Sequence, residues 1–174
     1  MDDNPQPFAQ FGEAIVAEAK RIEEDATYSA KGHFEAARRW DSVHLWIGIP
    51  TTLVAAAAGV SALKDLKALS AVLSLLVAAS AAVFTFLNAE TRAARHLRAG
   101  NAYKALQNDA RIFHQVQCQQ GRRPAELSAA LQELNKTRNK LNSESPQIPR
   151  RAFESARKGI EGGEATYQVD KSGL

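Results

Sequence analysis

Cysteine is nearly absent from this chain: its 174 residues include one cysteine, Cys118. A single cysteine excludes an intramolecular disulfide and a zinc site built from several thiolates. The four histidines are scattered along the sequence, and no two of them have the spacing of a metal site. Neither a disulfide framework nor a structural metal is therefore expected to support the fold.

Catalytic and phosphate-binding motifs are missing as well. The chain contains neither GxxxxGK[ST] nor GxGxxG, the glycine-rich loops that cradle phosphates, and no serine in a GxSxG setting. Acidic pairs such as Glu23 and Glu24 lie in a charged helical pattern, where solvation explains them. We therefore expect a protein that is not an enzyme, takes no cofactor and does not bind nucleic acid directly.

Two stretches near the middle of the chain, residues 43–63 and 68–89, contain no Asp, Glu, Lys or Arg. An α-helix rises ~1.5 Å per residue, so each stretch would cover roughly 31 Å, the thickness of a bilayer's hydrocarbon core. Only four residues join them, so two spanning helices would be antiparallel neighbours. The pattern predicts a transmembrane hairpin; the alternative is a pair of Ala-rich core helices in a soluble protein.

Basic residues flank the two stretches unequally. Two lysines, Lys64 and Lys67, lie in the predicted turn, and six basic residues lie on the side of the termini. This asymmetry predicts that both termini are cytoplasmic. The absence of Asp, Glu, Lys and Arg from the spans argues against a proton relay or an ion-coupled carrier. The six flanking residues are Lys31, Arg38, Arg39, Arg92, Arg95 and Arg98.

Small residues recur every four positions in both predicted spans. Such stripes let helices approach closely in lipid, where packing drives association. They either close the hairpin on itself or form a face for self-assembly or a pore. The candidate assembly residues are Thr51, Ala55 and Gly59 in the first span and Ser70, Ser74 and Ala78 in the second.

Three arginines one turn apart, Arg92, Arg95 and Arg98, follow the second span. At the membrane surface they would contact anionic lipid headgroups. The phosphate of a signal ligand is the alternative.

Outside the spans, apolar residues at helical spacing predict a helix over residues 8–41 and others over residues 90–120 and 125–143. Residues 1–42 have a net charge of −4 and residues 88–174 a net charge of +6, so these helices are expected to pack together as a cytoplasmic bundle. Residues 146–174 are expected to form a short helix and a flexible tail. The predicted fold is an all-α membrane protein.

Two segments resemble a known bacterial family. The first contains RIEEDATYSAKGHF at residues 21–34, ARRW at 37–40 and HLWIGIP at 44–50; the second is GNAYKALQNDARIF at 100–113. In this order, around two spans, they resemble the SLATT family, the SMODS- and SLOG-associating two-transmembrane effector domain. The resemblance covers about residues 8–145, so residues 1–145 are taken as one SLATT-like domain.

The resemblance implies a role in bacterial antiphage conflict systems. Such a domain would lie in the cell inner membrane, form a homo-oligomer and permeabilise the bilayer on a nucleotide or partner signal, causing growth arrest or death. The resemblance brings no nucleotidyltransferase, SLOG or reverse transcriptase domain within this chain, so either a separate nucleotide-producing or nucleotide-sensing partner supplies the signal or the helices of this chain sense it directly. The alternative is a membrane anchor whose helical bundle recruits a soluble partner.

Overall fold

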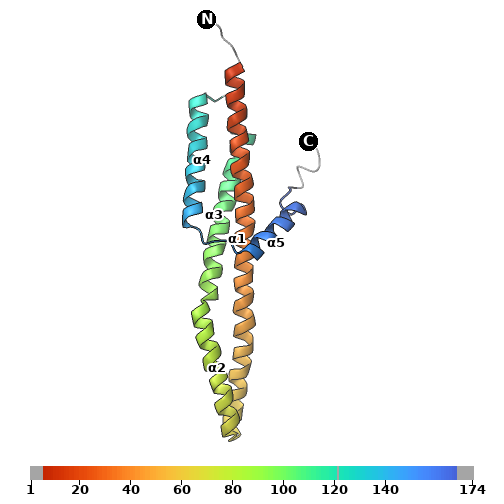
Figure 1. The fold of residues 1–174 in the computed structure, drawn as a ribbon, viewed down its shortest axis with the longest axis vertical. Helices are drawn as coiled ribbons and strands as arrows, with labels where there is room; N and C mark the ends of the chain where they lie inside the picture. Colours follow the sequence, from red (N-terminus) through yellow and green to blue (C-terminus); the bar gives the residue numbers. More distant parts are fainter. Residues whose placement is uncertain (1–5, 121, 168–174) are drawn as a thin grey trace. The chain divides into compact units, whose positions relative to one another are not determined.

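The computed structural model describes residues 6–120 and 122–167, with side-chain surroundings from Gln10 onward. These residues form helices and connecting turns, and no β-strand occurs among them (Figure 1), so the predicted all-α fold is confirmed. The helices are α1 (Gln6–Leu63), α2 (Lys67–Leu87), α3 (Ala89–Gln115), α4 (Pro124–Glu144) and α5 (Arg150–Glu161), with a 3₁₀ turn at Gln117–Gln119.

The chain divides into two compact units. The bundle unit consists of Met1–Ala36 and His96–Leu174, and the apolar unit consists of Ala37–Arg95. α1 contributes its first half to the bundle unit and its second half to the apolar unit. The tail predicted within residues 146–174 follows α5, and its last part, residues 168–174, lies outside the described residues.

The core of the bundle unit forms where α1, α3 and α4 meet. Ile22 of α1 is 0% exposed and packs in one cluster with Tyr103 and Leu106 of α3. Leu131 and Leu134 of α4 pack against this cluster, and Figure 1 shows α4 alongside α1 and α3. Burying a side chain such as Ile22 contributes about 1.5–3 kcal/mol. The α3 residues of the core step by four, three, four and three, as a heptad seam does: Ala99, Tyr103, Leu106, Ala110 and Phe113.

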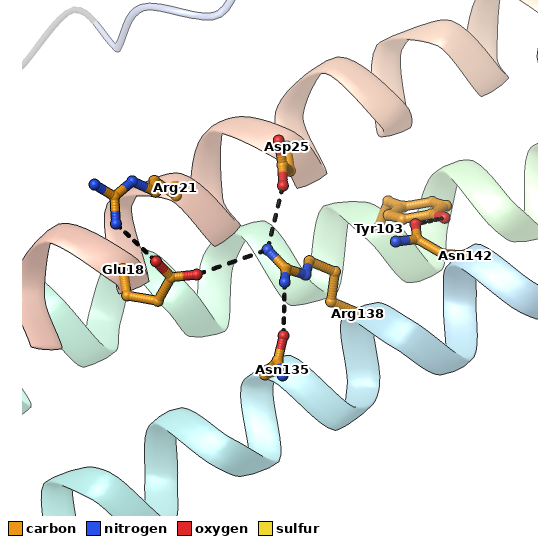
Figure 2. Close-up of polar contacts among 7 residues, drawn as sticks. All are labelled: Glu18, Arg21, Asp25, Tyr103, Asn135, Arg138 and Asn142. Carbon is orange, nitrogen blue, oxygen red and sulfur yellow. Dashed lines mark hydrogen bonds and ion pairs between the residues drawn. The ribbon is translucent and has the colours of Figure 1, made fainter.

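Charged side chains join the acidic first helix to the basic later ones. Figure 2 shows Arg138 of α4 reaching α1, with its guanidinium 3.3 Å from an oxygen of Asp25 and 3.9 Å from an oxygen of Glu18. The same guanidinium donates to Asn135 at 2.7 Å, which fixes its orientation. Arg138 thus makes a polar contact with α1 from a helix whose leucines, Leu127, Leu131, Leu134 and Leu141, pack in the core.

Two left-handed residues mark the limits of α2. Asp65, with φ 57°, lies in the turn from α1, and Asn88, with φ 46°, separates α2 from α3. Asparagine tolerates this conformation better than most residues, and its N–H caps α2 by donating to the carbonyl of Phe84. The apolar pattern of residues 68–89 therefore ends at Asn88, where α3 starts a new helix.

Candidate functional site

The apolar unit exposes large hydrophobic side chains. Two helical stretches are long and apolar enough to cross a membrane: Gln10–Leu63 in α1, and Lys67–Gln119, which includes α2 and α3. In their most apolar 18-residue segments, only 6% and 0% of the residues are buried. A core helix of a soluble protein would bury most of such a segment. Trp46 is 80% exposed, Leu63 90% and Phe86 86%. The exposed surface also includes Leu45, Ile49, Leu53, Val60, Leu69, Val72, Leu75, Leu76 and Val83.

Within the apolar unit, α1 and α2 meet along a seam of buried and half-buried residues. The least exposed positions step by three and four along each helix, as at a coiled-coil contact. Ser70 Oγ donates to the carbonyl of Ala58 at 3.4 Å, and the rings of His44 and Phe84 lie 4.9 Å apart. The seam consists of Thr51, Val54, Ala58 and Ser61 in α1 and Ser70, Leu73, Val77, Ser80 and Phe84 in α2.

The six predicted assembly residues divide between this seam and the exposed surface. Thr51 and Ser70 are half-buried in the seam. The other four are exposed, and a Cβ added at Gly59 would meet nothing within 4 Å. These four do not close α1 on α2, because their positions are displaced around each helix from the seam; they are Ala55, Gly59, Ser74 and Ala78.

Hydroxyl groups in the two apolar helices bond to their own backbone. Thr51, Thr52 and Thr85 each donate to the carbonyl four residues earlier, at 2.7–2.9 Å. Ser61 does the same at 2.8 Å. Such bonds satisfy a hydroxyl in an apolar environment without a second helix or water. These groups are therefore compatible with lipid.

The three predicted headgroup-binding arginines have different surroundings. The guanidinium of Arg92 lies over the ring of Trp40, 5.0 Å from its centroid, and its Nε donates to the carbonyl of Leu87 at 3.0 Å. The structure thus joins Trp40 and the first of these arginines in a cation–π contact. Arg95, in the same unit, is exposed. Arg98 belongs to the bundle unit and is also exposed.

A histidine pair that the sequence pattern does not predict lies inside the bundle unit. His33 and His96 are buried, their Nδ1 atoms are 2.9 Å apart, and the His33 ring stacks on Tyr103. Burial, followed by the neighbouring His96, lowers the pKa of His33 from 6.5 to about 4. Burial also lowers the pKa of His96. Because His96 and Tyr103 are seven residues apart on one helix face, the heptad spacing is the signal that could have placed them together.

This pair is too small for a metal centre. In residues 6–120 and 122–167, no group of three or more His, Cys, Asp or Glu side chains could hold an ion. One Nδ1 must instead donate a hydrogen bond to the other, which requires at least one neutral ring.

Comparison with known proteins adds no relative. No protein-family model, no curated protein and no solved structure matches this chain.

Proposed function

We propose that this chain is an integral membrane effector whose apolar unit is a transmembrane hairpin with both termini in the cytoplasm. The observation that carries the proposal is the exposure of the most apolar 18-residue segment in each of the two helical stretches, of which only 6% and 0% is buried. In water this surface would be costly, at roughly 25 cal/mol per Å² of apolar area. Lipid removes that cost, and the self-bonded hydroxyls and the Arg92–Trp40 pair suit a helix entering a bilayer.

The proposed action is permeabilisation of the cell inner membrane by a homo-oligomer. Ala55, Gly59, Ser74 and Ala78 support it, because small residues left exposed beside the seam offer a second close-packing face. The resemblance to the SLATT family supports a place in a bacterial antiphage system, with a nucleotide or a separate partner protein as the signal. Opening such a pore would stop growth or kill the infected cell.

Dye leakage from liposomes carrying the purified protein tests this function. We expect protein-dependent release that increases with protein density and with the system's nucleotide signal. Ser74→Leu should reduce release because a branched side chain blocks the exposed small-residue face. Ala79→Leu is the matched control, since it adds the same side chain to an exposed position outside the stripe. Intact liposomes under every triggering condition would contradict the pore.

A membrane anchor that recruits a soluble partner is the second candidate. A groove between α3 and α4 favours it: Ile112 and Phe113 of α3 and Ala130 and Leu134 of α4 line this groove, and Ile112 is substantially exposed. An anchor needs no second contact face in the membrane. Under this alternative, Ser74→Leu leaves the activity of the system unchanged while Ile112→Asp abolishes it.

A further inference from the structure

Two adjoining pockets lie in the bundle unit between α1 and α3, beneath the segment that follows α5, and together they are called the cleft here. The cleft has two lobes of about 300 and 200 Å³, and Thr27, Gln107 and Tyr167 line both. Arg111 and Lys20 line the larger lobe, and Lys31 and Lys104 line the smaller one. Four cations from two helices therefore surround one cleft.

The segment Glu164–Tyr167, here called the arm, covers this cleft. Lys31 Nζ donates to Glu164 Oε2 at 2.6 Å. Lys104 Nζ donates to the Tyr167 hydroxyl at 3.2 Å. The Arg111 guanidinium lies 4.6 Å from the centroid of the Tyr167 ring, and the Lys104 ammonium lies 5.6 Å from it. The arm thus presents one carboxylate and one flat ring to three cations.

The arm uses the donors of the cleft incompletely. The Nε–H of Arg111 is buried and has no hydrogen-bond partner, although Arg111 carries the ring contact. A buried donor without a partner is rare, because it has lost water and gained nothing in exchange. The contact to Glu164 is also weakly held, since that side chain is 64% exposed and water screens the ion pair.

Two acidic residues also line the larger lobe. Glu23 is engaged by His114, whose Nε2 lies 2.6 Å from Glu23 Oε2. Glu24 is exposed at the rim. Against these two carboxylates stand Lys20, Lys31, Lys104 and Arg111, so without the arm the cleft has an excess of positive charge.

We propose that this cleft binds a nucleotide and that the arm is its built-in competitor. A nucleotide combines a flat ring with a phosphate, the same pair of groups that Tyr167 and Glu164 supply, and its phosphate carries more charge than one carboxylate. The base would stack on Arg111 as Tyr167 does, and the phosphate would take charge-assisted bonds from the lysines and from Arg111 Nε–H. The binding step stands alone, whereas its role as the release signal for the pore rests on the proposed function.

Fluorescence titration of the full-length protein in detergent micelles with mant-ATP and mant-GTP tests the site. Tyr167→Ala should tighten binding of at least one probe about tenfold because the competitor's ring is gone. Arg111→Gln should weaken binding by about tenfold or more, the scale of one lost charge-assisted contact. Lys136→Gln, which removes an exposed cation of α4 outside the cleft, should change nothing. Circular dichroism of each variant verifies that the helices are intact.

Several results would overturn this site. The site is refuted if neither mant-ATP nor mant-GTP binds at millimolar concentration. It is also refuted if Arg111→Gln and Lys136→Gln lose binding equally. Tyr167→Ala weakening the binding would show that the arm is no competitor. These results separate the site from the proposed function. If the titrations give the expected binding but the liposomes stay intact, only the pore is contradicted. If the liposomes leak but no nucleotide binds, only the nucleotide site in the cleft is contradicted.

Discussion

Mild acid should destabilise the bundle unit through its buried histidine pair. His33 is 1% exposed, shares a hydrogen bond with His96 and stacks on Tyr103. Protonating both rings would break the Nδ1 contact and place two positive charges side by side in a desolvated site. The folded state therefore resists protonation that the unfolded chain accepts freely.

The size of the effect follows from the pKa of His33, about 4 in the folded protein and 6.5 in the unfolded chain. Between these two values the unfolded state binds more protons, so the free energy of unfolding falls as the pH falls. The loss is about 2 kcal/mol at pH 5 and about 3 kcal/mol below pH 4, with no loss above pH 7. The lowered pKa of His96 acts in the same direction.

Denaturation of the full-length protein in a nonionic detergent, followed by circular dichroism between pH 7.5 and 5, measures this loss. His33→Gln should flatten the pH dependence, because glutamine hydrogen-bonds but does not titrate. His114→Gln is the control, since it removes a histidine from the same unit and leaves the pair intact. A wild-type stability that does not change over this range, or an undiminished slope in His33→Gln, would refute the reasoning.

Four further substitutions probe packing. Ile22→Ala should lower the free energy of unfolding by about 2–5 kcal/mol, measured by the same denaturation, because it opens a cavity between α1 and α3; a loss below about 0.5 kcal/mol would count against this core. Gly100→Ala should cost about 1–3 kcal/mol, since its Cβ would lie 2.7 Å from the Phe34 ring, whereas Gly12→Ala, with open space, should be neutral or stabilising. Gly59→Leu should preserve helicity and reduce dye leakage; unchanged leakage would remove Gly59 from the assembly face.

Helical periodicity predicted the fold well where one helix face is buried. Ile22 and Leu106 lie on the expected stripes, and both are buried in the core. The break at Asn88 was not predicted, because asparagine occurs both within helices and at their ends, and only its backbone conformation distinguishes the two. Arg138 lies among the leucines of α4, and its pairing with Asp25 depends on the packing of α4 against α1, which the sequence of α4 alone does not give.

The candidate site was less predictable, because it depends on pairs of residues far apart in the sequence. Small residues every four positions mark a stripe, but the α1–α2 contact follows alternating steps of three and four, which leaves Gly59 and Ser74 exposed. His33 and His96 looked isolated, since the chain between them hides their proximity. Tyr167 gave no local signal either, because its partners Lys104 and Arg111 lie two helices earlier.

Topology in living bacteria is the most direct test of the central claim that the apolar unit spans the membrane. In a Cys118→Ser background, single cysteines would be placed in the α1–α2 turn as Asp65→Cys and in α4 as Gln132→Cys, both exposed positions. A membrane-impermeant maleimide added to intact spheroplasts should label the turn cysteine at once and the α4 cysteine only after lysis. Equal labelling of the two before lysis, or no labelling of the turn until lysis, would contradict a hairpin with both termini in the cytoplasm.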